Sequence, residues 1–509
     1  MSPLFLIPAL LGLLALSTQA QQVEQLQEDG SAATYTDSAT GKTITPTIEV
    51  KNGKRYYNWP MWNKFKNRKM QVHRERTNHP GAQWWPHAGL GLFMHWGIVS
   101  EFAPSGEAWS GRLRKNRPDA FHPQSEIWAA AETFNPTNYD PDEWMAGARR
   151  AGFRYSVITT KHHDGYTLWP SAATNPHRQN WGSTRDMVGE LAEAVRARGM
   201  RFGTYYSTGL DWSFQMVTDG DMVRDILLSA PASQAYADYT HAHMVELIDR
   251  YHPDLLWADI GYPSKGRQGE LFDYYFTQVP EGTVNDRWGA VDDLGQIARI
   301  PGATWVLKAL GRLLISSEAD PLADDPARFG YKTAEYDSLP GTPAFKWEST
   351  RGLGGSFAFN AAETAADMLS PAELIDYLVD TVAKNGNVLI NVGPDSYGYI
   401  PDIQQAPLLG LGEWLSINGE AIYATRPWSR FKNLRGRELR YTQSDTALYA
   451  IVIGAVEQSF TIEQPGITSS SIEVLGAEVV RAQDHDGLLT LTLSKPLMGP
   501  AAVVRFNVP

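Results

Sequence analysis

The 509-residue chain contains no cysteine, which excludes disulfide bonds and leaves stability to the packed core. It also lacks a long apolar run after residue 20, so nothing beyond that point resembles a membrane span. Long basic runs are missing and the net charge is −12, which argues against nucleic acid and acidic membrane surfaces as partners. With 43% hydrophobic residues, the chain can nevertheless bury a large core.

Histidine is scarce, with 12 residues in 509, yet two are adjacent in the stretch TTKHHDGYTLW. His162 and His163 follow small and β-branched residues and directly precede Asp164. Three interpretations are open at this point: a metal site, a polar clamp for a ligand rich in hydroxyls, or an ordinary strand end.

The first twenty residues are expected to form a secretory signal peptide. Their apolar run, Leu4–Leu16, is too short to span a bilayer comfortably, and small residues precede a cleavage point after Ala20. No Lys or Arg stands ahead of the run, which keeps an uncleaved anchor as the alternative. We therefore expect a secreted or periplasmic protein that is free of the membrane after cleavage of residues 1–20.

The remaining chain divides into three segments by pattern. Residues 21–80 are polar and irregular and are expected to be an N-terminal extension. Residues 81–427 alternate β-rich runs with amphipathic helices, whose starts carry signals such as Asp140 as N-cap before a proline. From residue 428 to residue 509, short alternating runs predict a C-terminal antiparallel β-sandwich.

The alternating segment predicts an α/β fold. Repeated strand–helix units imply parallel strands with right-handed crossovers. About eight units fit the segment, which favours a (β/α)₈ TIM barrel over a doubly wound open sheet. Residues 290–330 fit no unit and are treated as an insertion that cannot be placed. Neither a G-x-G-x-x-G fingerprint nor a Walker motif is present, so nucleotide binding has no support.

In a barrel of this kind the active site lies at the carboxyl ends of the strands. The residues that end the predicted strands are aromatic rings, imidazoles and carboxylates: His95, Trp96, His162, His163, Asp164, Tyr205, Tyr206, Trp257, Asp259, Asp286, Arg287, Trp288, Glu335, Trp347 and Glu348. His95, His162 and Asp259 could supply a metal site. Tryptophans beside most of these candidates favour a pyranose instead, with hydroxyls bound by imidazoles and Arg. No metal or cofactor is therefore expected.

Glycoside hydrolysis needs two carboxyl groups. Asp259 ends an apolar strand and is the candidate nucleophile, although it could simply cap the next helix. Glu335, in YKTAEYD, is the candidate acid/base, although it could be a surface residue. Glu107 and Glu348 are the alternatives for that second role.

At these residues the chain resembles glycoside hydrolase family 29, the retaining α-L-fucosidases. The resemblance covers about residues 89–427 and rests on the joint order of its anchors: GLFMHWG, YDPDEWMAGARRAG, TTKHHDGYTLW, RDMVGELAEAVRARG, RFGTYYS, PDLLWADIG, VNDRWG, FKWE, GNVLINVGP and LGEWLSINGEAIY.

The resemblance implies a barrel followed by a β-sandwich, and an exo-acting enzyme that removes terminal α-L-fucosyl residues from glycans or glycoconjugates without a metal. It implies that Asp259 is the nucleophile and that Glu335 is the acid/base. The residues that it implies for binding fucose or supporting the nucleophile are His95, His162, His163, Tyr205, Trp257 and Arg287. It also implies that Phe93 and Phe357 form the wall around the methyl group of the sugar.

Three features depart from the family pattern. Glu107 and Trp109 are separated by one residue where family members have an adjacent pair, so either could touch the sugar. The insertion at 290–330 and the extension at 21–80 are both longer than usual. A metal-dependent hydrolase on the same barrel and a catalytically silent sugar-binding relative stay open as alternatives.

Overall fold

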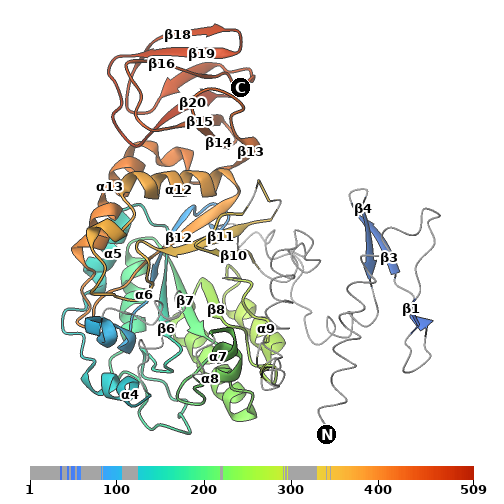
Figure 1. Ribbon diagram of the computed structural model, residues 1–509, viewed down its shortest axis with the longest axis vertical. Helices are drawn as coiled ribbons and strands as arrows, with labels where there is room; N and C mark the ends of the chain where they lie inside the picture. The colour runs from blue at the N-terminus through green and yellow to red at the C-terminus, as the bar shows by residue number, and fades with distance from the viewer. Residues whose placement is uncertain are drawn as a thin grey trace. The chain divides into compact units, whose positions relative to one another are not determined.

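The computed structural model describes four short strands before residue 60 and most of the chain after residue 83 (Figure 1). The described residues are 35–36, 43–44, 47–51, 54–58, 82, 84–105, 124–217, 222–290, 292, 295, 298, 330–339, 341–343 and 345–508. The expected signal peptide, Glu107, Trp109 and most of the insertion lie outside them. The chain forms two compact units, Met1–Gln71 and Val72–Pro509, which are described separately below.

The first unit contains two antiparallel strand pairs. Strand β1 (Tyr35–Thr36) pairs with β2 (Thr43–Ile44), and β3 (Thr47–Lys51) pairs with β4 (Lys54–Asn58). Between β3 and β4 the sequence is Asn-Gly, which favours a tight hairpin turn. All four strands lie within residues 21–80, the expected N-terminal extension, whose bounds stay a prediction.

The second unit is built on a curled sheet of eight parallel strands. Its order is β10-β11-β12-β5-β6-β7-β8-β9. The strands are β5 (Leu90–Met94), β6 (Tyr155–Lys161), β7 (Arg201–Ser207), β8 (Leu255–Asp259), β9 (Thr283–Val284), β10 (Lys332–Glu335), β11 (Trp347–Gly352) and β12 (Gly386–Val392). Four are buried along their whole length and three others at all but one residue, as expected for parallel strands covered by helices.

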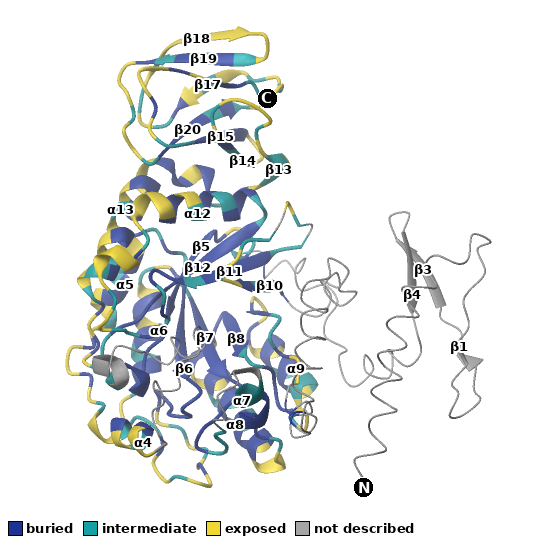
Figure 2. Ribbon diagram, viewed as in Figure 1, coloured by how far each residue is buried: buried dark blue, intermediate teal, exposed yellow. Residues whose placement is uncertain are grey.

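Helices surround this sheet and turn their exposed faces outward (Figures 1 and 2). They are α4 (Gln124–Thr133), α5 (Pro141–Arg150), α6 (Met187–Ala197), α7 (Met222–Ser229), α8 (Gln234–Tyr251), α9 (Gln268–Gln278), α12 (Pro371–Ala383) and α13 (Asp402–Asn418), with 3₁₀ turns η4 (Ile98–Ser105), η5 (Ala365–Asp367) and η6 (Gly419–Ala421). The predicted N-caps are formed: Asp140 accepts the N–H of Glu143, and Ser370 and Glu373 exchange both bonds of a capping box. None of the described helices is long and apolar enough to cross a membrane.

The barrel has a seam between β9 and β10, the two ends of the sheet order. Strand β9 ends at Val284, before Asp286, Arg287 and Trp288, which were predicted to end this strand. Across the seam, the N–H of Gly330 donates to the carbonyl of Val284 at 3.0 Å, and the N–H of Thr333 donates to the Asp286 carboxylate at 3.1 Å. One backbone bond and one bond to a carboxylate thus bridge the place where a strand ladder would close a regular barrel.

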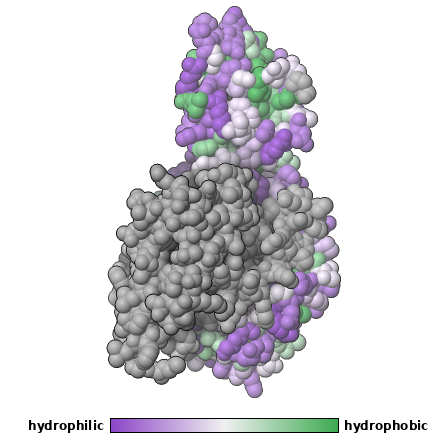
Figure 3. All heavy atoms as spheres, turned by 90° about the vertical axis from the view of Figure 1, so that its right-hand side faces the viewer, coloured by the Kyte–Doolittle hydropathy of each residue, from purple (hydrophilic) through white to green (hydrophobic). Residues whose placement is uncertain are grey.

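The C-terminal strands form two antiparallel sheets. One has the order β13-β14-β15-β20-β17 and the other β16-β19-β18. The strands are β13 (Arg426–Lys432), β14 (Leu439–Gln443), β15 (Ala447–Ile453), β16 (Ser459–Glu463), β17 (Ser471–Val474), β18 (Val479–His485), β19 (Leu488–Leu493) and β20 (Ala501–Asn507). Apolar residues of both sheets share one buried cluster, while the described outer surface in Figure 3 is mostly hydrophilic. The predicted barrel followed by a β-sandwich is confirmed.

Polar contacts join the sandwich to the last two barrel helices. Trp414 on α13 donates its indole N–H to the carbonyl of Ala501 at 2.9 Å. Arg440 on β14 donates to Asp380 on α12 at 2.7 Å. Strand β13 was not predicted, because its half-buried residues do not alternate cleanly.

Gly91, on β5, makes room for the Tyr155 ring of the neighbouring strand. A Cβ atom at Gly91 would lie 2.2 Å from the Tyr155 Cζ atom. We therefore expect Gly91→Ala to destabilise the protein by about 1–3 kcal/mol, the usual cost of overpacking a core. Gly147→Ala on α5 is the matched control, since its Cβ meets nothing closer than 3.9 Å. The control should stabilise the helix by about 0.5–1 kcal/mol. Thermal unfolding midpoints that move the same way in both variants would contradict this account.

Candidate active site

Seven predicted ligand-binding side chains gather at the carboxyl ends of β5 to β8 and after β11. The ring centroids of neighbours in this group lie 4.1 to 5.7 Å apart. Phe357 is half-buried and the others are buried: Phe93, His95, His162, His163, Tyr205 and Trp257. The structure therefore brings together residues that are more than 250 positions apart in the sequence.

The two adjacent histidines both reach this group because they lie just past the end of β6. Within a regular strand, successive side chains point to opposite faces. The pairing of β6 with β7 is irregular between Thr159 and Lys161, immediately before the histidines. An irregularity of this kind re-aims the side chains that follow it. The His162 and His163 rings consequently lie 4.1 Å apart.

A buried ion pair anchors the base of the histidine segment. Lys161 donates to the Asp211 carboxylate at 3.0 Å and to the carbonyl of Leu210 at 3.1 Å, and both charged side chains are fully buried. Removing one partner would leave an unpaired buried charge, which is strongly destabilising. The pair therefore fixes β6 to the loop that follows β7.

Asp259 stands at the end of β8, where its carboxylate accepts three hydrogen bonds and lies close to His163. Its Oδ2 atom accepts the Tyr205 hydroxyl at 2.8 Å and lies 3.9 Å from His163 Nε2. Its Oδ1 atom accepts Arg287 Nη1 at 3.1 Å and the backbone N–H of Ile260 at 3.0 Å. The carboxylate is thus oriented and leaves 14% of its side chain exposed towards the site.

The electrostatic surroundings keep Asp259 ionised. Burial alone would raise its pKa, but Arg287, His163 and the Tyr205 hydroxyl outweigh burial and hold the pKa of Asp259 below its ordinary value. An ionised carboxylate in a partly buried site is a ready nucleophile.

The chain is strained directly after Asp259. Ile260 is β-branched, yet it adopts φ +58°, which is unfavourable for such a residue and costs about 1–3 kcal/mol. Gly209 allows this conformation, because a Cβ atom there would lie 1.8 Å from the Ile260 carbonyl. The N–H of Gly209 also donates to the backbone carbonyl of Asp259 at 3.1 Å.

Arg287 connects Asp259 with Glu335 across the seam. Its Nη2 atom donates to Glu335 at 3.1 Å, its Nε atom donates to Thr333 at 3.0 Å, and its guanidinium lies 4.7 Å from the centre of the Trp257 ring. The Glu335 side chain is 42% exposed, whereas that of Asp259 is 14% exposed. One carboxylate therefore lies deep in the site and the other at its mouth.

Glu348, a sequence-based alternative for the acid/base, has a different position. Its side chain is fully buried and accepts the Tyr155 hydroxyl at 2.6 Å and the Trp257 indole N–H at 2.9 Å. Burial raises its pKa to about 7, although both donors oppose the shift. Glu348 thus lies beneath Trp257 and supports it from the barrel interior.

The imidazoles of His95 and His163 are neutral at physiological pH. Burial, the largest effect on each, lowers the pKa of His95 to about 4 and the pKa of His163 to about 3. His95 Nδ1 lies 2.7 Å from Asn391 Oδ1, and His163 Nδ1 lies 2.5 Å from Ser207 Oγ. Neutral, oriented imidazoles suit hydrogen bonding to hydroxyls.

Three residues of this site escaped the sequence-based prediction: Ser207, Thr333 and Asn391. Each of them supports a side chain that was predicted to bind the ligand: Ser207 contacts His163, Thr333 contacts Arg287, and Asn391 contacts His95. Asn391 could have been noticed as a polar residue within the apolar strand NVLINV. Ser207 and Thr333 carried no comparable signal, because both lie within polar stretches.

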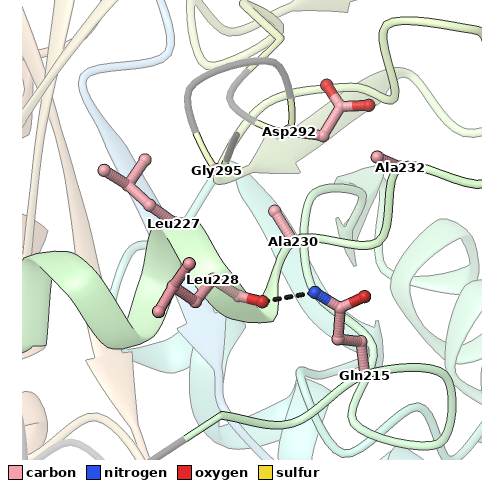
Figure 4. Close-up of a pocket in the computed structure, with 7 residues that line it drawn as sticks. All are labelled: Gln215, Leu227, Leu228, Ala230, Ala232, Asp292 and Gly295. Carbon is pink, nitrogen blue, oxygen red and sulfur yellow. Dashed lines mark hydrogen bonds between the residues drawn. The ribbon is translucent and has the colours of Figure 1, made fainter. Parts of the chain in front are cut away.

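A separate small pocket lies beside α7 (Figure 4). It is lined by Gln215, Leu227, Leu228, Ala230, Ala232, Asp292 and Gly295. None of the carboxylates or rings described above contributes to it, so we place the candidate active site at the strand ends. Within the described parts of the chain, no three His, Asp or Glu side chains are grouped to hold a metal ion, and this includes the alternative set His95, His162 and Asp259. The absence of a metal stays a prediction.

A deep ionised carboxylate and a second carboxylate at the mouth, surrounded by rings at the carboxyl ends of parallel barrel strands, define the class of barrel glycoside hydrolases. Residues 61–420 match the family model described as alpha-L-fucosidase. The chain belongs to the α-L-fucosidase family. The resemblance seen in the sequence is thereby confirmed, and the match begins 28 residues before residue 89, where the resemblance was placed.

Characterised relatives cover most of the chain. The human tissue alpha-L-fucosidase is 30% identical over 443 residues, which are 83% of this chain and 87% of the relative. The rat enzyme is 29% identical over 444 residues, again 83% of this chain and 87% of the relative. The Thermotoga maritima alpha-fucosidase, solved in complex with fucose, is 32% identical with a TM-score of 0.65, and the match covers 85% of this chain and 98% of that one.

The raised pKa of Glu348 predicts a pH-dependent stability. For an acid whose pKa rises from 4.5 to about 7 on folding, the associated stability is complete below pH 4.5 and is lost as pH rises through 7. At ~1.4 kcal/mol per pKa unit, the loss reaches up to about 3 kcal/mol. Glu348→Gln removes this pH dependence. The melting temperature of the variant minus that of the wild type should therefore increase from pH 5 to pH 8. Exposed Glu413→Gln, the control, should show no such trend. If the difference in melting temperature between Glu348→Gln and the wild type did not change with pH, Glu348 would be ionised in the folded protein throughout this range.

Proposed function

We propose that the protein is an exo-acting α-L-fucosidase that removes terminal α-L-fucosyl residues from glycans or glycoconjugates with retention of configuration. The observation that carries the residue assignment is the Arg287 guanidinium, which bonds both Asp259 and Glu335 at 3.1 Å. A retaining mechanism needs two carboxyl groups roughly 5–5.5 Å apart, and a shared guanidinium supports such proximity.

In the first step, Asp259 attacks the anomeric carbon while Glu335 donates its proton to the glycosidic oxygen. The bond from the anomeric carbon to that oxygen breaks, the aglycone leaves as an alcohol, and an ester joins Asp259 to the sugar. The exposure of Glu335 supports the acid role. The aglycone lies on the solvent side of the site, so the acid that protonates its oxygen must also lie near solvent.

In the second step, water replaces the aglycone. Once Asp259 is esterified it carries no charge, so Arg287 faces Glu335 alone. The remaining carboxylate is then stabilised in the form that a base needs. Glu335 takes a proton from water, the water oxygen attacks the anomeric carbon, and Asp259 leaves as a carboxylate, which returns the site to its initial state.

The rings suit recognition of a deoxy sugar. Phe357 is half-buried and lies 4.9 Å from the His95 ring, whereas Phe93 is only 1% exposed beneath its neighbours. Between the two predicted wall residues, Phe357 is the better placed to cover the methyl group of fucose. An added hydroxyl at that position would be buried without a partner, at a cost of about 1–3 kcal/mol.

The proposal includes export. The apolar run Leu4–Leu16 and the small residues before Ala20 support a secreted or periplasmic enzyme. N-terminal sequencing of the mature protein would reveal whether it begins near Gln21.

Asp259→Gly should fold and lose hydrolysis by more than about 10³-fold, the scale on which loss of a covalent nucleophile acts. Azide should then restore turnover, because it can attack the anomeric carbon from the side that the carboxylate has vacated. The product would be the β-fucosyl azide, identified by NMR. Wild-type turnover in the variant, or an azide product of unchanged configuration, would remove Asp259 from this role.

Glu335→Ala should affect substrates according to their leaving groups. Loss of a general acid costs about 10²- to 10⁴-fold when the leaving group needs a proton, and far less when it does not. Natural glycans should therefore suffer much more than a dinitrophenyl fucoside. Exposed Glu270→Ala on α9 is the control and should leave both kcat/KM values unchanged. An equal loss on both substrates would assign Glu335 to binding and direct attention to Glu107.

A further inference from the structure

Asn391 on β12 has no predicted role, yet its side chain contacts two residues that do. It is 1% exposed. Its Oδ1 atom lies 3.2 Å from the backbone N of His95 and 2.7 Å from His95 Nδ1. Its Nδ2 atom donates to the carbonyl of Phe357 at 2.6 Å. One amide thus joins an imidazole on one side of the site to the loop that carries Phe357 on the other.

The partners of Asn391 determine which way its amide faces. The Phe357 carbonyl can only accept, so it must face the amide nitrogen. The backbone N–H of His95 can only donate, so it must face the amide oxygen. Because that same oxygen is the partner of His95 Nδ1, this ring nitrogen must carry the proton. A neutral His95 then presents Nε2 as a lone pair, which can only accept a hydrogen bond.

The surroundings of His95 support the neutral form. Burial is the main effect that lowers its pKa to about 4, and the nearby Arg287 lowers it further. Opposing effects come from Asn391 and Asp259. The other titratable side chains packed against the imidazole are those of His162, on the loop after β6, and Tyr205, on β7.

We propose that Asn391 is a positioning residue that makes His95 an obligate hydrogen-bond acceptor and holds Phe357 against the same sugar. This inference rests on the proposed function. It assigns the direction of the hydrogen bond: the sugar hydroxyl that faces His95 must be the donor, and His95 Nε2 the acceptor. A substrate with fluorine or a methyl ether at that hydroxyl offers no proton and should be rejected.

The same strand provides a matched control. Asn387, four residues earlier, is fully buried, accepts the N–H of Gly89 at 3.1 Å and donates to the carbonyl of Trp85 at 2.7 Å. It therefore makes the same backbone bonds as Asn391 but lies at the opposite end of β12. Replacing either asparagine with aspartate removes one backbone bond and introduces the same buried charge.

Asn391→Asp should change specificity and pH dependence together. Loss of the donor to Phe357 frees its loop, so kcat/KM for an aryl fucoside should fall at least about tenfold and the preference over the matching β-L-galactoside should shrink. A carboxylate beside His95 raises its pKa by about 1–3 units. As the pH falls, His95 then becomes protonated, and stops accepting a hydrogen bond, at a higher pH than in the wild type. The acidic limb of the kcat/KM profile should therefore move up by about one pH unit or more. Asn387→Asp should lower the melting temperature. It should leave unchanged both the preference for the fucoside over the galactoside and the acidic limb of kcat/KM.

The wild-type protein supplies a test that does not depend on activity. In ¹⁵N-histidine-labelled protein near neutral pH, the His95 resonances, assigned by their loss in His95→Gln, should show a protonated Nδ1 and an unprotonated Nε2. The opposite tautomer, or equal effects of both aspartate variants on preference and pH limb, would overturn the proposal. If the wild-type enzyme cleaves no fucoside, the proposed function fails, while the ring-nitrogen shifts still decide the role of Asn391 towards His95.

Discussion

The Arg287 guanidinium is the interaction on which the arrangement of the site depends. It donates to Asp259 from β8 and to Glu335 from β10, and these strands lie on the two sides of the barrel seam. Two nearby carboxylates would repel each other without it. The same cation lies over the Trp257 ring, so the charge that pairs the carboxylates also holds one of the rings of the candidate site.

Polar groups within the barrel form a second layer below the site. Glu348 receives bonds from Tyr155 and Trp257, and Asn391 bonds both His95 and the Phe357 loop. Each of these groups would be costly to bury alone, and each has its partners. The rings above them are therefore held by hydrogen bonds as well as by packing, which preorganises the site for a ligand.

The sequence predicted the fold well because strand and helix periods and caps are local. Strand β7 was predicted at its observed bounds, since it is a compact β-rich run between a helix end and a loop. The seam could not be predicted, because the early end of β9 depends on side-chain bonds to Thr333, which is distant in sequence. The residues that gather in the candidate site were proposed from their position at the ends of the predicted strands, and their roles stay predictions. The supporting residues, Asn391 above all, were missed because their role depends on which neighbours they contact.

The seam also has a consequence for how this architecture can change over time. The segment carrying Glu335 pairs with β11 but has no strand ladder with β9, and Glu335 is joined to Asp259 through the Arg287 side chain. The sequence of residues 290–330 enters the chain at this same boundary. A barrel divided in this way is modular: the part that contacts the leaving group can be lengthened or exchanged while the ladder that carries Asp259 is inherited intact. Diversity in the aglycone can thus arise without disturbing recognition of the cleaved sugar.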